Sequence, residues 1–213
     1  MKKFILPLLL LLAIGMLAAV ESAPSDVVGY VKYDMGIGLN TFALPMETTY
    51  DWASEIGDAN PGCFDAIFFW DFASQAWGGA SDLGGFWDGD FEIASGNVLM
   101  SSNIATLSFY SIGELPAVAP VYTLGAGLNT LMLPLNRSDL EWASELGIET
   151  TVAEAVFYWD FASQAFGGAS DLGGFWDGDF EISIGMPLMV SSLGNATWPT
   201  RAASTGTFRS NNK

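Results

Sequence analysis

The sequence contains no histidine, and 7 Lys and Arg stand against 24 Asp and Glu among its 213 residues. Without histidine the chain lacks the usual general base near neutral pH, both Ser-His-Asp and Cys-His catalysis, and the commonest zinc ligand. A formal net charge of −17 argues against nucleic-acid partners and anionic membranes, because both are bound through clustered Lys and Arg. Cys63 is the only cysteine, which excludes an internal disulfide and leaves a buried thiol or a bridge between two chains.

Long hydrophobic runs are also scarce, and the one present lies at residues 4–20, directly after two lysines. It ends in small residues near Ala23, which is the pattern of a signal peptide and its cleavage site. The run contains Pro7 and is shorter than the roughly 20 residues that a membrane-spanning helix needs. We therefore predict a signal peptide over residues 1–23, a secreted, periplasmic or cell-surface location, and no membrane span after signal removal.

What the chain does have is two copies of one module. Aromatic residues make up 14% of the sequence and half of it is apolar, so the acidity does not indicate disorder. Residues 66–93 and 155–182 differ at only three of 28 positions, while the flanking segments diverge quickly. The sequence predicts β module 1 at residues 27–113, a linker with two prolines at 114–120, β module 2 at 121–199 and a disordered tail at 200–213.

Hydrophobic alternation predicts the fold class. A strand signal at residues 39–46 places Asn40, Phe42 and Leu44 on one face. The run at 66–72 is apolar on both faces, which indicates a central strand that is covered on both sides. We predict an all-β fold of two tandem antiparallel β-sandwich or partly closed barrel modules, each with one short helix.

The short helix is predicted from signals at its ends. In the second module, Ser138 and Glu141 fit a capping box at the helix start. Gly57 and Gly147 stand where a left-handed residue would end the helix of each module. The sequence therefore predicts helices that begin shortly before Trp52 and Trp142 and end at these glycines.

The sequence carries short motifs: GYVK at residues 29–32 in the first module, and, in both modules, GLN at 38–40 and 127–129 and WD at 70–71 and 159–160. These motifs and their order resemble the tandem secreted repeat modules of Verrucomicrobia, Cloacimonadota and related bacteria. Those modules combine a GYVK-like strand, a G-x-N-L-I-x-x-P-L strand and an aromatic W-D strand. Their closing strand, with a second glycine and an aromatic residue, is not matched here. The resemblance implies a β-sandwich-like surface or secreted module of unknown activity.

Acidic residues alternate in the last strand signal of each module. On a strand that begins near residue 86, alternate carboxylates would line one face, with no Lys or Arg between them. A Ca²⁺ ion would relieve their repulsion if a bulge or turn made them converge, whereas the alternative is a solvated acidic edge that discourages edge-to-edge pairing. The candidate metal ligands are Asp88, Asp90 and Glu92 in the first copy and Asp177, Asp179 and Glu181 in the second.

Aromatic and amide side chains next to the glycine-rich turns form a second candidate site. Carbohydrate-binding proteins stack sugar rings on aromatic side chains and bind the hydroxyl groups with amides and carboxylates. The competing interpretation is that the aromatic residues close the core beneath the turn. The candidate ligand-binding residues are Gln75, Trp77, Asp82 and Phe86 in the first copy and Gln164, Phe166, Asp171 and Phe175 in the second.

Catalysis by paired carboxylates is the remaining chemistry to weigh. Glycoside hydrolysis needs two carboxyl groups at a defined separation in a deep cleft, which modules this small rarely build. We therefore predict a protein that is not an enzyme and that needs no cofactor.

The near-identity of the two segments has two explanations. Packing alone does not demand identical polar residues, so the repeated surface either has a repeated role or was recently homogenised at the DNA level. We predict an exported structural or interaction protein of the bacterial cell surface that presents two copies of one acidic, aromatic-rich face. The alternatives are a pair of carbohydrate-binding modules and a self-assembling surface or filament subunit. The partners would be a polysaccharide, another surface protein or a second copy of the chain.

Overall fold

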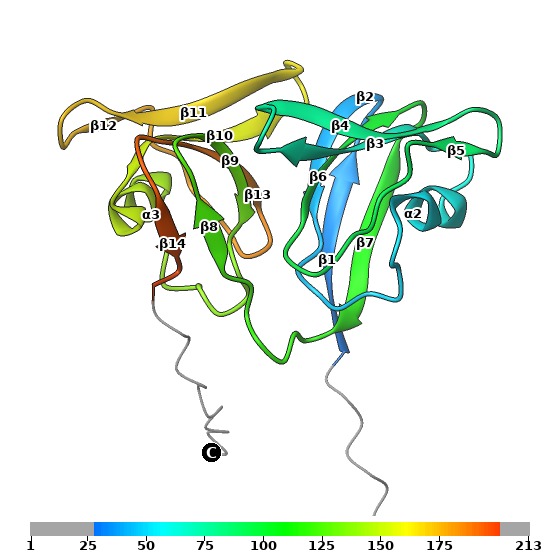
Figure 1. Cartoon of the computed structure of the whole chain (residues 1–213), viewed down its shortest axis with the longest axis horizontal. Coiled ribbons are helices and arrows are strands. Elements are labelled where there is room, and N and C mark those ends of the chain that lie inside the picture. Colours follow the sequence, from blue (N-terminus) through cyan, green and yellow to red (C-terminus); the bar gives the residue numbers. More distant parts are fainter. Residues whose placement is uncertain (1–27, 201–213) are drawn as a thin grey trace, which may run out of the picture.

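A computed structural model of the chain describes residues 28–200 (Figure 1). The predicted signal peptide and all but the first residue of the predicted tail lie outside these residues. Strands dominate the described part, and they fall into two five-stranded and two two-stranded antiparallel sheets. Among residues 28–200, no helix combines the length and the apolar sequence that crossing a membrane requires.

Module 1 contains one five-stranded sheet in the order β2-β6-β3-β4-β5 and one two-stranded sheet, β1-β7. Its elements are β1 (Val28–Met35), β2 (Gly38–Ala43), α2 (Ala53–Ala59), β3 (Phe64–Asp71), β4 (Ala76–Asp82), β5 (Trp87–Asp88), β6 (Val98–Asn103) and β7 (Leu107–Glu114).

Module 2 repeats this topology, with a five-stranded sheet in the order β12-β11-β10-β13-β9 and a two-stranded sheet, β14-β8. Its elements are β8 (Tyr122–Leu124), β9 (Gly127–Met132), α3 (Ala143–Thr150), β10 (Ala153–Asp160), β11 (Ala165–Asp171), β12 (Trp176–Asp177), β13 (Pro187–Ser192) and β14 (Ala196–Trp198).

In each module the two-stranded sheet and the helix cover one face of the five-stranded sheet. The core of module 1 joins Phe42 of β2, Ile67 of β3 and Phe109 of β7 to Ile56 of α2. Cys63 is half-buried against this core. The predicted all-β sandwich architecture is confirmed, and neither sheet closes into a barrel. The central position of the apolar run that begins at residue 66 is also confirmed, because β3 is the middle strand of its sheet.

The predicted helix ends are wrong in both modules. Helices α2 and α3 begin at Ala53 and Ala143, after Trp52 and Trp142 and not before them as predicted. The side chain that caps α3 is Glu145, whose carboxylate accepts the backbone N–H groups of Glu141 and Trp142 at 2.8 and 3.0 Å. Ser138 and Glu141 lie before the helix, because the chain turns into it only at Trp142.

Gly57 and Gly147 lie inside the helices and do not end them. Both are buried, and a Cβ atom at either position would overlap the indole ring of Trp87 or Trp176. The glycines are therefore required by a close approach of a tryptophan, and the left-handed residue at the end of α3 is Thr151, with φ of 63°.

The predicted last strand is also wrong. Only Trp87 and Asp88 pair with β4, and Gly89 then takes a φ of 76°, which turns the chain out of the sheet. The segment returns to an extended contact only at Glu92, which bridges to Trp52. Because residues 88–92 do not form one strand, their carboxylates do not line one face.

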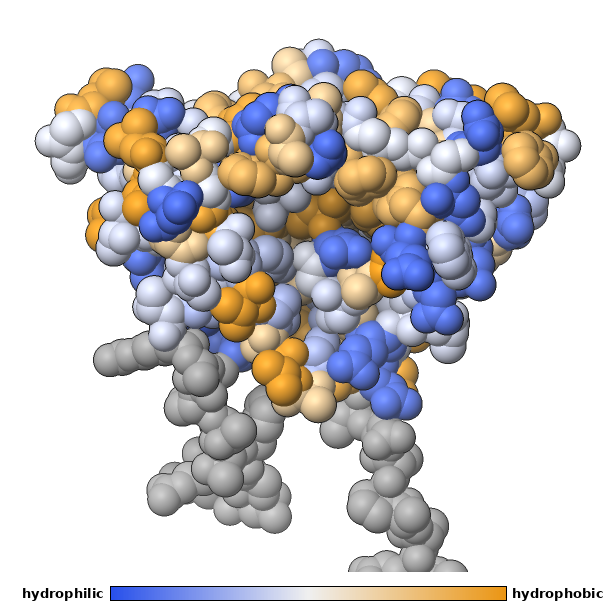
Figure 2. Space-filling view, in the orientation of Figure 1, coloured by the Kyte–Doolittle hydropathy of each residue, from blue (hydrophilic) through white to orange (hydrophobic). Residues whose placement is uncertain are grey.

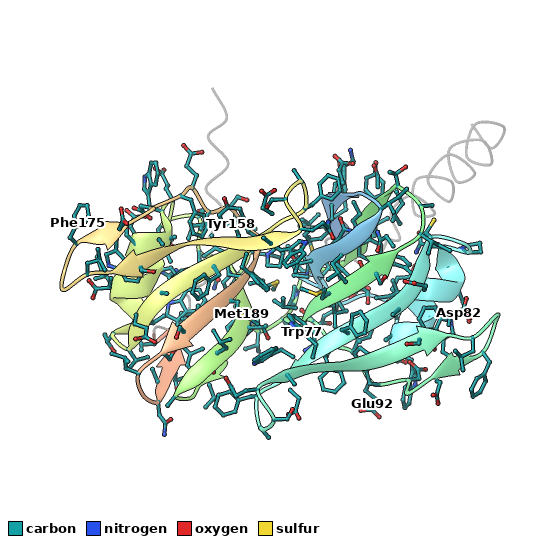
Figure 3. The ribbon with its side chains drawn as sticks, turned by 90° about the horizontal axis from the view of Figure 1, so that it is seen from above. Trp77, Asp82, Glu92, Tyr158, Phe175 and Met189 are labelled. Atoms are coloured by element: carbon teal, nitrogen blue, oxygen red, sulfur yellow. The ribbon has the colours of Figure 1, made fainter. Side chains whose placement is uncertain are left out.

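The two modules lie side by side, with α2 and α3 on the two outer sides (Figure 1). Seen from above, Trp77 and Met189 lie in the middle of the molecule, whereas Asp82 and Phe175 lie at its two far ends (Figure 3). The β4-β5 and β11-β12 hairpins therefore point in opposite directions.

Candidate functional site

The hairpin turn between β3 and β4 is shaped by its own side chains. The Asp71 carboxylate accepts the Ala73 N–H at 3.0 Å and the Ser74 hydroxyl at 2.6 Å. These hydrogen bonds, the Ser74 hydroxyl above all, hold the pKa of Asp71 below its ordinary value. The turn ends at Gln75, which has a φ of 52°, a left-handed conformation that is uncommon for a residue other than glycine.

The Gln75 side chain binds the backbone N–H and carbonyl of one residue of the other module. Its Oε1 atom accepts the Leu128 N–H at 2.7 Å, and its Nε2 atom donates to the Leu128 carbonyl at 3.2 Å. The Trp70 indole N–H donates to the same carbonyl at 2.9 Å. The side-chain amide of Gln75 thus pairs with both backbone groups of Leu128, in the way that a residue on a neighbouring strand would.

The same contact is made in the opposite direction. Gln164 accepts the Leu39 N–H at 2.7 Å and donates to the Leu39 carbonyl at 3.1 Å, and the Trp159 indole N–H donates to that carbonyl at 2.7 Å. Two equivalent sets of residues therefore contact each other reciprocally, which is the geometry of a symmetric homodimer interface built within one chain. We call these two contacts, Gln75 and Trp70 on Leu128 and Gln164 and Trp159 on Leu39, the clasps.

The turn before β2 presents the Leu39 peptide to its clasp. The Asn40 side chain accepts the Gly36 N–H at 3.0 Å and donates to the carbonyls of Gly36 and Gly38 at 2.8 and 2.9 Å. Gly38 has a φ of 99°, which a residue with a Cβ adopts only with strain. The GLN motif therefore fixes a turn whose next peptide points outward, and Asn129 does the same in module 2.

Aromatic residues pack across the interface between the two modules, next to the clasps. We call this interface the seam. The Phe161 ring lies against Gly36, where a Cβ atom would overlap it, and Phe72 lies in the same way on Gly125. Tyr33 donates its hydroxyl to the Gly185 carbonyl at 2.7 Å. In the opposite direction, Tyr122 of module 2 donates its hydroxyl to the Gly96 carbonyl of module 1 at 3.1 Å. Burial raises the pKa of both tyrosines, so their hydroxyls stay protonated donors.

Four of the candidate ligand-binding residues lie at this seam. Gln75 and Gln164 are engaged in the clasps. Phe166 lines a gap of about 10 Å³ between the modules together with Trp77. Trp77 packs edge-on against Trp70, with ring centroids 5.4 Å apart.

The other four candidates lie at the hairpin tips, far from the seam. The Asp82 carboxylate accepts the N–H groups of Gly84 and Gly85 at 2.9 and 2.6 Å, and Asp171 accepts that of Gly174 at 2.6 Å. Phe86 and Phe175 are 66% and 67% exposed. The structure therefore does not bring the eight candidates together into one site.

The candidate metal ligands are dispersed. Asp90 accepts the backbone N–H and the hydroxyl of Ser54 at 3.0 and 2.6 Å at the start of α2, and Asp179 does the same for Ser144 of α3. The remaining four are Asp88, Glu92, Asp177 and Glu181, whose side chains make no hydrogen bond within residues 28–200. In the same residues no three acidic or cysteine side chains are placed to hold a metal ion.

A cleft larger than the gap beside Phe166 also lies between the modules. Residues of both modules line a cleft of about 320 Å³, visible as the hollow in the middle of the face shown in Figure 2. Its lining residues are Phe69, Trp70, Phe91, Glu92, Gly96, Asn97, Val98, Leu99, Tyr122 and Thr130.

Sequence reasoning missed the clasps and the cleft, because both depend on how the modules meet. The available signal was that Asp71, Ser74 and Gln75 are repeated without change in the second copy. No known protein family, no curated protein and no solved structure matches this chain. The resemblance to secreted bacterial repeat modules therefore stays a prediction.

Proposed function

We propose that this chain is a non-enzymatic structural protein of the bacterial cell surface that assembles with copies of itself through its two hairpin tips. The tips are residues 83–86 and 172–175, which have the same sequence, Leu-Gly-Gly-Phe. The predicted signal peptide supports export. The observation that carries the proposal is the exposure of the same two large apolar side chains at both ends of the molecule.

Each tip is a fixed turn that holds its apolar side chains in solvent. Leu83 donates its N–H to the Phe86 carbonyl at 2.8 Å, and Gly84 and Gly85 between them have φ values of 87° and 94°. Two successive left-handed residues are typical of a tight hairpin turn that glycine accommodates without strain. Leu83 and Phe86 are each 66% exposed, and their counterparts Leu172 and Phe175 are 66% and 67% exposed.

Burial does not explain why these residues are the same in both copies. The core position occupied by Ile67 in module 1 is Val156 in module 2, although both are fully buried. Leu83 and Phe86 contribute little to either core, yet they are unchanged at Leu172 and Phe175. A repeated binding role at the tips accounts for this identity.

The position of the tips favours a second copy of the chain as the partner. Two identical apolar surfaces at opposite ends can pair tip to tip, and such pairing extends without limit because each chain keeps one free tip. A tip is much smaller than the ~1,000 Å² that a stable interface buries, so a single contact is weak. Chains held together on a cell surface would gain strength from the multiplicity of contacts.

Sedimentation velocity from micromolar to millimolar concentration tests this proposal. The wild-type protein is expected to form a growing series of oligomers, Phe86→Ser is expected to stop at dimers, and the double variant Phe86→Ser, Phe175→Ser is expected to stay monomeric. Leu193→Ser is the matched control, because Leu193 is 73% exposed but lies outside the tips. A monomeric wild type at all concentrations, or a double variant that assembles normally, would contradict the proposal.

A further inference from the structure

We propose that the cleft between the modules binds one neutral sugar ring. This site is separate from the hairpin tips, and it uses none of the eight ligand-binding residues suggested by the sequence. Its wall is aromatic, its rim carries polar groups that the protein leaves free, and it lies open on one face of the molecule (Figure 2). A volume of about 320 Å³ is at the lower end for ligand pockets, which suits a small ligand.

The aromatic wall offers a surface for the C–H face of a sugar. Phe69 of β3 and Phe91 pack against each other with ring centroids 4.7 Å apart, and Trp70 extends the lining beside them. All three rings are only partly buried, so part of their surface remains open to the cleft. Partly exposed aromatic surface gains free energy when an apolar ligand face covers it.

The polar groups of the cleft divide into those already used and those left free. The Trp70 indole N–H is engaged with Leu128, and the Tyr122 hydroxyl donates to the Gly96 carbonyl. Asn97 accepts the Ala94 N–H through Oδ1 at 2.8 Å, and its Nδ2 group has no hydrogen-bond partner among residues 28–200.

The Glu92 carboxylate and the Thr130 hydroxyl make no side-chain hydrogen bond within the described residues. Glu92, Thr130 and Asn97 all line the cleft. They supply it with an acceptor, a hydroxyl that both donates and accepts, and an amide donor. Sugar hydroxyl groups both donate and accept hydrogen bonds, so this combination suits them.

The charge of the lining residues indicates which ligands the cleft can bind. The lining contains Glu92 and no Lys or Arg, so an acidic sugar would be repelled. A quaternary ammonium ion needs aromatic faces on several sides, whereas Phe69 and Phe91 contact each other and form one wall. Such an ion also cannot accept a hydrogen bond from the Asn97 amide. The lining therefore favours a neutral sugar.

The repeat of the modules would allow two equivalent clefts, but only one of them is open. The expected stoichiometry is therefore one ligand per chain. The equivalent position on the other side of the seam has Met186 in place of Asn97 and Pro187 in place of Val98. There the side chains of Val31 and Tyr33 lie close to Gly185, at 3.2 and 3.4 Å from where a Cβ would stand. Met186 thus removes the polar side chain that Asn97 supplies to the cleft, and Val31 and Tyr33 pack where the second cleft would open.

Isothermal titration of the purified chain with neutral oligosaccharides, such as maltose, cellobiose and mannobiose, tests the inference. One of them is expected to bind with a stoichiometry of one and to change tryptophan fluorescence through Trp70. Glu92→Gln is expected to weaken binding by ~10-fold or more, because it removes a charge-assisted hydrogen bond. Glu181→Gln is the matched control, since Glu181 is the counterpart of Glu92 outside the cleft, and it should bind as the wild type does.

Three results would overturn the inference. The first is that no oligosaccharide binds. The second is equal weakening by Glu92→Gln and Glu181→Gln, which would place binding elsewhere. The third is saturable binding of tetramethylammonium chloride, used as a competing probe, without any sugar binding. None of these results depends on assembly through the tips, so the two proposals succeed or fail separately.

Discussion

The two modules are nearly identical in residues 66–93 and 155–182, which include the turns that form the clasps, and differ most in their two-stranded sheets. Strands β1 and β7 of module 1 pair from Val28 opposite Glu114 to Met35 opposite Leu107, along all 8 residues of each strand. Strands β8 and β14 of module 2 are only 3 residues long. The two modules therefore share one topology, but the two-stranded sheet that covers the core is built differently in each. We call these two-stranded sheets, β1-β7 and β14-β8, the covers.

Different side chains close the two covers. In module 1, Phe109 packs in an aromatic cluster, with its ring 5.0 Å from that of Phe42. In module 2, the fully buried Trp198 takes this place, and the Arg137 guanidinium lies 5.5 Å above its ring. Arg137 is in turn held by Glu149 and Asp139.

The clasps constrain the sequence of the turns in the two near-identical segments, residues 66–93 and 155–182. The clasps need the same turn on both sides, because each turn binds the peptide that the other module presents. The covers take no part in the clasps. They reach the other module only through single side chains such as Tyr33 and Tyr122, and their cores have repacked independently. Geometry at the seam thus gives a structural reason for identity at Asp71, Ser74 and Gln75, beside the possibility of homogenised DNA.

The largest expected effect separates the two covers. Trp198→Ala and Phe109→Ala should each cost ~3–5 kcal/mol of unfolding free energy, because each removes a buried aromatic side chain. Trp198→Ala should also release β14, which is held by few backbone pairs, while β7 stays paired in Phe109→Ala. Denaturant unfolding measures the first effect, and hydrogen exchange of β8 against β1 amides measures the second. Equal exchange in the two variants would show that the covers do not differ as described.

An intermediate effect should be the same in both modules. Gly57→Ala and Gly147→Ala should each cost ~1–3 kcal/mol, because the new Cβ overlaps a tryptophan ring that cannot move freely. Urea titration of the two variants gives the values, with Gly62→Ala for comparison, since nothing lies within 4 Å of a Cβ there and only its positive φ resists substitution. A neutral result in either module would mean that the ring is not fixed against the helix.

The smallest effect concerns acid stability. Asp71 and Asp160 have folded pKa values below their ordinary value of 3.8, because a serine hydroxyl and backbone N–H groups bind the charged form. Their contribution is present above pH ~4 and is lost as the pH falls through the lower folded pKa. Asp71→Asn, Asp160→Asn should therefore lower the melting temperature at pH 7 and flatten its fall below pH 4. An unchanged acid profile would contradict the proposed hydrogen bonding at the turns.

Local patterns predicted the strands better than the helix ends. Alternation at Asn40 and Phe42 identified the buried face of β2, because burial on one side is a property of the strand itself. The start of α3 was placed too early because its N-cap is Trp142, which is not a usual capping residue, so the Glu145 at N3 was not recognised as the cap. The acidic strand failed at Gly89, whose left-handed conformation breaks the alternation.

The seam could not be predicted from either module alone. Gln75 bonds a peptide 53 positions away, so its role depends on the placement of the whole second module. Its repetition at Gln164 marked it as unusual and pointed equally to a ligand. The cleft was hidden for the same reason, because Trp70 of module 1 and Thr130 of module 2 line it together.

Two reciprocal clasps join the modules, and amide hydrogen exchange at Leu39 and Leu128 measures whether they form in solution. Both amides should be protected in the wild type. Gln164→Ala should expose the Leu39 amide and leave Leu128 protected, and Gln75→Ala should do the opposite, because each glutamine acts only on the other module. Rapid exchange of both amides in the wild type, or loss of protection within the mutated module, would show that the clasps do not form.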